Sequence, residues 1–281
     1  MEKTFKNIIR EILAILFRLS GIFFLIREIF CKNRVTIVFY HNPEPKIFKR
    51  HIEYLSRRYN FISLNRAVKA IRRKDWSDIP PKSLVITIDD GHKGNFDLLP
   101  VFKEFKVIPT IYICSQIVGT YRHFWFESGD QRSMPELMKC PNQEMLKRLE
   151  RQSGFQPTKE YPKEQRHALS REEIDLMRNY VDFQVHTRFH PILTKCSQNE
   201  CEEEIADAKK EVEEMIGRKC KYFPYPRGAY SDREIELVKK AKYASARTCD
   251  VGWNDAKTNP YKLKTIAVPD DASIHKDTTI S

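Results

Sequence analysis

Hydrophobic and polar positions change their spacing several times along the chain, and these changes divide it into elements. Runs of β-branched and aromatic residues predict buried strands, whereas apolar residues every three or four positions predict amphipathic helices. The predicted strands are residues 35–40, 61–64, 83–88, 108–114, 181–187, 221–226, 243–248 and 263–268. The predicted helices are residues 47–59, 66–73, 98–105, 201–217 and 231–242. This alternation indicates an α/β fold with a mainly parallel sheet or a barrel.

Residues 119–180 interrupt the alternation. They are rich in charged, aromatic and proline residues and contain no clear strand. We therefore expect an insertion that lies over one end of the barrel.

The most apolar stretch of the chain, residues 7–30, lies near its N-terminus. It has about the 20 residues that a bilayer-spanning helix needs. Arg10, Glu11 and Arg18 interrupt it and fall on one narrow stripe of a helix. This pattern favours an amphipathic helix that lies in a membrane interface.

Two other interpretations of this stretch remain open. An uncleaved signal anchor would also have basic residues before its apolar run, as Lys3 and Lys6 are here. A buried core helix is the third possibility. The preferred division of the chain is a membrane-associating helix over 1–31 and one catalytic domain over 32–281.

The balance of charged residues supports a membrane surface as a partner. Lysine and arginine number 49 against 38 acidic residues, which gives a formal charge of +11 and favours anionic partners. The chain has no zinc-finger spacing and no recognisable nucleic-acid module, so we expect no nucleic-acid partner. Its seven cysteines include no CxxC pair, which favours a reducing compartment. We expect the cytoplasmic face of a membrane, with a signal-anchored protein facing outside as the alternative.

Residues with metal-binding and proton-transfer chemistry follow three predicted strands. His41 follows 35–40, Asp89 and Asp90 follow 83–88, and His186 begins a His-x-x-x-His sequence that ends at His190. Active sites of such folds collect at the carboxyl ends of the strands. Two histidines and one carboxylate can bind a metal and leave coordination positions open. Taken singly, each pattern also fits a surface pair or a helix cap.

Three segments carry a family resemblance. TIDDG (87–91), HTRFHP (186–191) and FPYPRG (223–228) resemble, in order, the first three motifs of the NodB-homology polysaccharide deacetylases, carbohydrate esterase family 4. The similarity covers about residues 34 to 270. It implies a distorted (β/α) barrel. It also implies metal-dependent removal of an acetyl group from an N-acetylated amino sugar of a polysaccharide or lipid-linked glycan.

The resemblance also implies roles for individual residues. Asp90, His186 and His190 would bind a divalent metal, most often Zn²⁺, and Asp89 would be the general base. The backbone N–H of Arg227 would stabilise the oxyanion.

The chain departs from the family pattern at two places. Pro224 stands where many members have an arginine that orients the base, so the partner of Asp89 is not identified. The C-terminal motif lacks its histidine. Because one branch of the family takes its general acid from a histidine after the first strand, we predict His41 as the acid, with His275 or water as alternatives.

Three aromatic residues are candidates for contact with a sugar. Tyr225, Trp125 and Trp253 would pack on a pyranose ring, or they would belong to the protein core. Two other functions remain open for the whole chain. One is a catalytically silent scaffold that binds a glycan or a partner protein, and the other is an O-acetyl esterase that uses the same residues.

Overall fold

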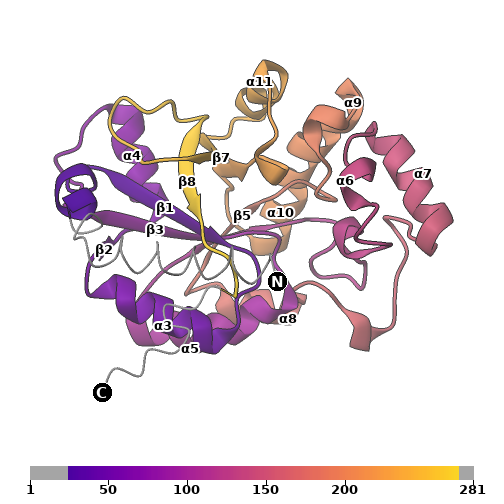
Figure 1. Cartoon of the computed structure of the whole chain (residues 1–281), viewed down its shortest axis with the longest axis horizontal. Coiled ribbons are helices and arrows are strands. Elements are labelled where there is room, and N and C mark those ends of the chain that lie inside the picture. Colours follow the sequence, from indigo (N-terminus) through magenta and orange to yellow (C-terminus); the bar gives the residue numbers. More distant parts are fainter. Residues whose placement is uncertain (1–24, 272–281) are drawn as a thin grey trace, which may run out of the picture.

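A ring of parallel strands forms the centre of the molecule (Figure 1). The computed structural model describes residues 25–271. Within this range the strand order is β5-β4-β3-β1-β8-β7-β6, with β2 beside β3, and every ladder between these strands is parallel. The strands are β1 (Val35–Tyr40), β2 (Asn60–Phe61), β3 (Ser83–Ile88), β4 (Thr110–Ile113), β5 (Asp182–Val185), β6 (Tyr222–Pro224), β7 (Ser245–Val251) and β8 (Leu263–Ala267).

A side chain bridges the gap between the two ends of this sheet. In the described chain no backbone ladder joins β5 to β6. The Oε1 atom of Gln184 instead accepts hydrogen bonds from the backbone N–H groups of Lys221, at 2.7 Å, and Tyr222, at 3.0 Å. The sheet is therefore a nearly closed, distorted barrel, and the predicted fold class is confirmed.

Helices surround the strands and begin where the sequence supplies caps. The main helices are α3 (Pro45–Ser56), α4 (Leu64–Arg73), α5 (Leu99–Phe105), α8 (Arg171–Met177), α9 (Gln198–Glu202), α10 (Ala208–Ile216) and α11 (Asp232–Lys240). Ser170, Ser197 and Ser231 each form a capping box with the glutamate three residues later. Such boxes satisfy backbone N–H groups that the first helical turn leaves unpaired.

The predicted elements are present with bounds that differ by up to three residues, and two of these differences have a clear local cause. The strand expected at 61–64 was wrong beyond Phe61, because the hydroxyl of Ser63 accepts from the N–H of Arg66 and starts α4. The helix expected at 201–217 begins earlier, at Gln198, because Ser197 caps it. It also contains a π-helical turn, η6 (Glu203–Asp207), before α10.

The core occupies both faces of the strands. Val35, Val85, Tyr112, Tyr222 and Leu263 are buried in one cluster. They come from five strands that are not all neighbours, so this cluster fills the inside of the barrel. A larger cluster packs the outer strand faces against α3, α5, α8 and α10.

The segment predicted as an insertion, 119–180, contains helices and loops between β4 and β5. Its helices α6 (Met134–Leu137) and α7 (Asn142–Ser153) lie beside the barrel, on the right in Figure 1. The short helix η3 (Trp125–Glu127) reaches back over the carboxyl ends of the strands. The insertion therefore supplies side chains to the site described below.

The N-terminal prediction is only partly within the described range. Residues 7–24 and His275 lie outside it, and η1 (Ile26–Phe30) is a π-helical turn that leads to β1. In the part of the chain that the structure describes, no helix has both the length and the apolarity to cross a bilayer.

Candidate metal and catalytic site

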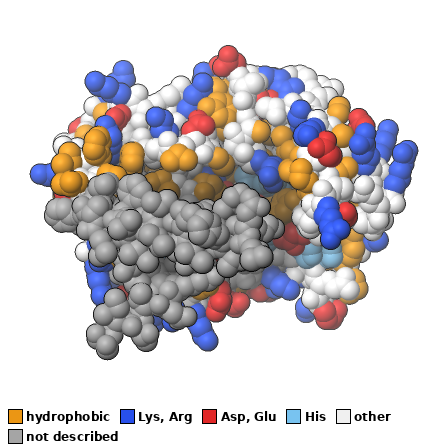
Figure 2. Space-filling model, in the orientation of Figure 1, with side chains coloured by type: hydrophobic (Ala, Val, Ile, Leu, Met, Phe, Trp, Pro, Cys, Tyr) orange, Lys and Arg blue, Asp and Glu red, His pale blue; other side chains and the backbone are white. Residues whose placement is uncertain are grey.

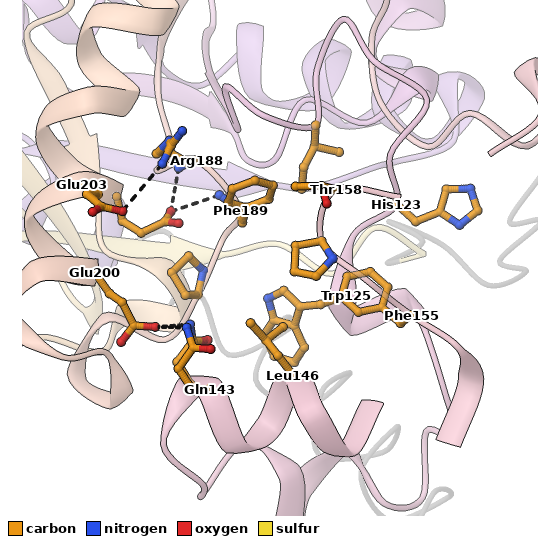
Figure 3. Close-up of a pocket in the computed structure, with 15 residues that line it drawn as sticks. His123, Trp125, Gln143, Leu146, Phe155, Thr158, Arg188, Phe189, Glu200 and Glu203 are labelled. Carbon is orange, nitrogen blue, oxygen red and sulfur yellow. Dashed lines mark hydrogen bonds and ion pairs between the residues drawn. The ribbon is translucent and has the colours of Figure 1, made fainter. Parts of the chain in front are cut away.

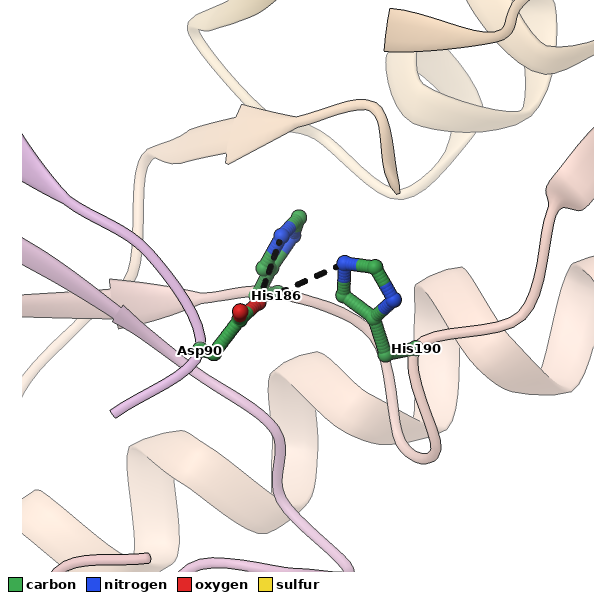
Figure 4. Close-up of side chains that lie close together, drawn as sticks. All are labelled: Asp90, His186 and His190. Carbon is green, nitrogen blue, oxygen red and sulfur yellow. Dashed lines mark ion pairs between the residues drawn. The ribbon is translucent and has the colours of Figure 1, made fainter. Parts of the chain in front are cut away.

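Asp90, His186 and His190 meet at the carboxyl ends of β3 and β5 (Figure 4). The Nε2 atoms of His186 and His190 lie 3.4 and 3.3 Å from the Oδ1 atom of Asp90. One ligand atom from each of the three side chains lies within 4.8 Å of the others. The three predicted ligands are thus together in one buried cluster.

The electrostatics of the cluster suit a bound cation. Burial lowers the pKa of His186 and of His190 to about 3, although the charge of Asp90 opposes the shift. Burial opposes ionisation of Asp90, but His190 and the hydrogen bond from His92 outweigh it and lower the Asp90 pKa. Two neutral imidazoles and one carboxylate are the donor set of many zinc sites. Asp90 Oδ1 is buried and has no hydrogen-bond partner, so the residues present fit a divalent metal.

The loop between the two histidines is held by two other segments of the chain. Its turn places Thr187 and His190 at positive φ, 64° and 59°. Glu204 in η6 accepts the backbone N–H groups of Arg188, at 2.8 Å, and Phe189, at 3.0 Å. The indole N–H of Trp125 donates to the carbonyl oxygen of His190 at 2.8 Å. These contacts fix the turn that aims both imidazoles at Asp90.

His92 contacts Asp90 of the cluster, although the sequence pattern indicated no role for it. Its Nε2 atom lies 3.2 Å from Asp90 Oδ2, and its Nδ1 atom lies 3.4 Å from Glu127 Oε1. Glu127 in turn lies 2.9 Å from Nδ1 of His167. Groups behind metal ligands orient them and tune their charge. The position of His92 two residues after Asp90 was the only sequence feature that could have suggested it.

Asp89 has an arginine partner after all. The guanidinium of Arg247 in β7 forms an ion pair with Asp89 Oδ2, and both side chains are buried. Burial in itself lowers the pKa of Arg247, but the charge of Asp89 outweighs it, and the pKa is raised. The guanidinium lies over the ring of Phe39, 4.5 Å from its centroid. Arg247 therefore stays charged beside the predicted base.

The position of Arg247 explains the proline in the third motif. Pro224 in β6 and Arg247 in β7 are register partners in the parallel ladder. An arginine from the neighbouring strand thus takes the place that the family resemblance had led us to expect at Pro224. Arg247 is the only charged residue of the predicted strand 243–248. This isolated charge was the sequence feature that could have pointed to it.

His41 lies on the same cleft, and its loop is anchored from two sides. Asp270 accepts the backbone N–H groups of His41, at 3.1 Å, and Asn42, at 3.0 Å. The side-chain amide of Asn95 donates to the carbonyl oxygen of His41 at 2.8 Å. The cleft has a volume of about 540 Å³. Its lining includes Phe39, His41, Asp89, Asp90, His92, Phe126, Glu127, His186, His190, Tyr225, Arg227, Cys249 and Asp270.

The remaining predicted residues occupy different places. Tyr225 and Arg227 line the cleft, and Arg227 has a φ of 55°. Trp125 is buried behind the histidine loop and lines a second cavity instead. Trp253, in the loop after β7, does not line the metal cleft. The structure thus brings together Asp89, Asp90, His186, His190, His41, Tyr225 and Arg227, but neither tryptophan joins them.

Comparison with known proteins identifies the family of the chain. Residues 77–246 match the sequence profile of the family described as polysaccharide deacetylase. The chain belongs to the polysaccharide deacetylase family. It is 23% identical over 189 residues to YxkH of Bacillus subtilis, a protein whose name assigns it to the polysaccharide deacetylases. That match covers 66% of this chain and 52% of YxkH, so the chain spans about half the length of this curated relative.

Solved structures of deacetylases share the fold of this family member. The deacetylase PplD of Streptococcus pyogenes, solved in complex with acetate, has a TM-score of 0.62 at 16% identity, covering 86% of this chain and 95% of PplD. IcaB from Ammonifex degensii has a TM-score of 0.62 at 18% identity, covering 84% of this chain and 92% of IcaB. At these identities the likeness establishes the fold.

Proposed function

We propose that this chain removes acetyl groups from N-acetylated amino sugars of a glycan in a metal-dependent reaction. One observation carries the proposal: Asp89, with its buried partner Arg247, lies in the same cleft as the Asp90, His186 and His190 cluster. Family membership supports glycan deacetylation as the reaction class.

Asp90, His186 and His190 would hold the metal, for which Zn²⁺ is our proposal. When bound, it would act as a Lewis acid and lower the pKa of water. The low pKa of both imidazoles keeps their nitrogen lone pairs available for binding. His92 and Glu204 hold Asp90 and the histidine loop in place.

Asp89 would accept the proton of the attacking water. Its Oδ2 atom is engaged by Arg247, whereas its Oδ1 atom is buried and has no hydrogen-bond partner. The ion pair keeps the Asp89 carboxylate oriented while Oδ1 remains available as a base.

His41 would donate a proton to the departing amine, and Arg227 would donate its backbone N–H to the developing oxyanion. His41 and Arg227 line the same cleft, His41 directly after β1 and Arg227 in the third-motif loop. An amide needs such an acid because an unprotonated amine is a poor leaving group. The same residues would also hydrolyse an O-acetyl ester, so an esterase is the second candidate activity.

The other alternative is a catalytically silent scaffold, and one of the two observations that favour it is weakened by the structure. It was motivated by Pro224 and by the absent C-terminal histidine. Arg247 supplies the charge that Pro224 cannot, and it does so beside Asp89.

For the location of the chain, we propose attachment to an anionic membrane surface near β1, with a lipid-linked glycan as one substrate. Leu25, Ile29 and Phe30 are 52%, 64% and 54% exposed, and Lys32 and Arg34 follow them. On the face in Figure 2, basic side chains lie beside exposed hydrophobic side chains, with acidic side chains among them. Apolar residues beside basic residues are typical of interfacial binding. The cytoplasmic face remains our preferred side.

The test of the proposed reaction measures metal content and acetate release together. We expect wild-type protein reconstituted with Zn²⁺ to release acetate from N-acetylglucosamine oligomers. Asp90→Asn and His186→Ala should lose both the bound metal and acetate release. The control is Asp175→Asn on α8, whose side chain is 61% exposed. Undiminished acetate release from either cluster variant would refute the mechanism.

A further inference from the structure

A second cavity lies on the other side of the histidine loop from the metal cleft. Figure 3 shows the residues that line it. Its volume is about 240 Å³. Neighbouring residues of the chain line different cavities. Trp125 lines the second cavity and Phe126 the metal cleft, and likewise Phe189 lines the second cavity and His190 the metal cleft. The walls are supplied by the insertion, by the histidine loop, and by α9 and η6.

The chemistry of the cavity differs between its two sides. Trp125, Phe155 and Leu146 lie on one side in Figure 3, and Glu200 and Glu203 lie on the other. Trp125 and Phe155 are buried and are held in a cluster with Leu149 and Ile192. The cavity therefore offers a fixed apolar wall opposite carboxylates.

The lining has an excess of negative charge. Three glutamates line the cavity, whereas Arg188 is its only lysine or arginine. Glu200 and Glu203 carry the negative charge, because burial raises the pKa of Glu204 to about 7. The guanidinium of Arg188 pairs with Glu211, which lies outside the lining, at 3.0 Å, and more distantly with Glu203, at 3.9 Å. His123 also lines the cavity, and burial lowers its pKa, so it adds little positive charge at neutral pH. A cationic occupant therefore complements the site.

We infer that this cavity binds an amino sugar with a free ammonium group, such as a deacetylated glucosamine unit. The ammonium would face Glu200 and Glu203, and the C–H face of the pyranose would pack against the apolar wall that Leu146 forms with Trp125 and Phe155. Asn142 and Gln143 already donate their amide N–H groups to Glu200, which leaves their side-chain carbonyl oxygens and the Thr158 hydroxyl for sugar hydroxyls. The choice of an amino sugar among amines rests on the proposed function, because deacetylation of a glycan produces this class of sugar.

Two glutamate substitutions test the site and leave the metal ligands and Glu204 unchanged. Glu200→Gln keeps the capping box at Ser197, because glutamine also serves at that position. Glu203 is exposed, so Glu203→Gln should fold normally. Gln143→Lys on α7 is a third variant, which places a positive charge next to Glu200. Glu202→Gln is the matched control, since Glu202 lies in the same segment but does not line the cavity.

The experiment is isothermal titration of the full chain with the glucosamine dimer, the N,N′-diacetylated dimer and a lysine dipeptide. We expect the glucosamine dimer to bind about tenfold or more tightly than the diacetylated dimer. Glu200→Gln, Glu203→Gln and Gln143→Lys should weaken binding of the glucosamine dimer, and Glu202→Gln should not. Equal binding of the two dimers, binding that the variants leave unchanged, or tighter binding of the lysine dipeptide would overturn the inference.

Acetate release from an N-acetylglucosamine oligomer, measured on the same preparations, separates this inference from the proposed function. Glu200 and Glu203 do not line the metal cleft, so their variants should keep wild-type acetate release. Absence of acetate release from every preparation would refute the proposed reaction, and the titration would still decide the amino-sugar site.

Discussion

Arg247 in β7 forms an ion pair with Asp89 at the end of β3, although the two residues are 158 positions apart in the sequence. Both side chains are buried, and the guanidinium of Arg247 lies 4.5 and 5.5 Å from the ring centroids of Phe39 and Tyr112. Its geometry makes the arginine a positioning group for the proposed base, because the second carboxylate oxygen of Asp89 stays without a partner.

The variant Arg247→Ala should lower both activity and stability. Removing one partner of a buried ion pair leaves an uncompensated charge and costs about 3–5 kcal/mol. We expect a lower free energy of unfolding in urea and a fall in kcat for acetate release. The double variant Arg247→Ala/Pro224→Arg should recover part of kcat, because residues 224 and 247 are register partners. If the double variant folds but its kcat stays as low as that of Arg247→Ala, an arginine at position 224 cannot replace Arg247.

His92 should affect metal binding more than folding. His92→Phe removes the contact with Asp90 Oδ2 and keeps a ring of similar size. We expect Zn²⁺ affinity to fall by about 10–100-fold, measured by competition with a chelator. His123→Phe is the control, because His123 stacks on Tyr161 and His167 away from the metal ligands. Equal Zn²⁺ affinities of wild type and His92→Phe would show that His92 does not contribute to metal binding.

The loss of rate on removing His41 should be larger for a substrate whose leaving group needs a proton. We expect His41→Asn to reduce acetate release from an N-acetyl sugar by about 10²–10⁴-fold. Hydrolysis of p-nitrophenyl acetate should fall much less, because p-nitrophenolate leaves without a proton. A parallel loss on both substrates would contradict the role of general acid. His51→Asn is the control, because His51 contacts Tyr40 of β1. Its rates on both substrates are measured in the same way.

Glu204 gives a prediction for the pH dependence of stability. Burial raises its pKa from 4.5 to about 7, although the N–H groups of Phe189 and Arg188 oppose the shift. Between pH 4.5 and 7 the folded protein keeps a proton that the unfolded chain has lost, so this group's contribution to stability falls as the pH rises. Relative to Glu204→Gln, wild type should lose up to about 3 kcal/mol across this window.

Urea unfolding of the metal-free proteins at several pH values between 4.5 and 7 measures this difference. Glu203→Gln is the control, because Glu203 is the exposed neighbour in the same π-helical turn. Stability curves of wild type and Glu204→Gln that stay parallel would show that Glu204 ionises normally in the folded protein.

The exposed side chains before β1 should contribute to membrane binding. We expect the triple variant Leu25→Gln/Ile29→Gln/Phe30→Gln to sediment less with phosphatidylglycerol vesicles than wild type does, and its thermal stability to stay unchanged. Leu176→Gln on α8, where Leu176 is 61% exposed, is the matched control. Equal sedimentation of all three proteins would exclude this surface as a membrane contact.

Much of the site could be predicted because its residues lie within short motifs. Asp89 and Asp90 directly follow a strand, and the turn from His186 to His190 brings its own two ligands together. Once the strands are parallel, their carboxyl ends share one edge, so these motifs converge whatever the details of packing. The fold class followed in the same way from the alternation of strands and helices.

The contacts that complete the site depend on which segments become neighbours in space. Arg247 reaches Asp89 because of its register beside Pro224 and the placement of β7 in the barrel. Glu204 meets the histidine loop because η6 packs against it, and Trp125 meets His190 because the insertion folds back over the barrel. The chain's local patterns specify secondary structure and motif chemistry. The partners of Asp89, Asp90 and the histidine loop instead follow from long-range packing and strand register, for which a one-dimensional pattern carries no distance information.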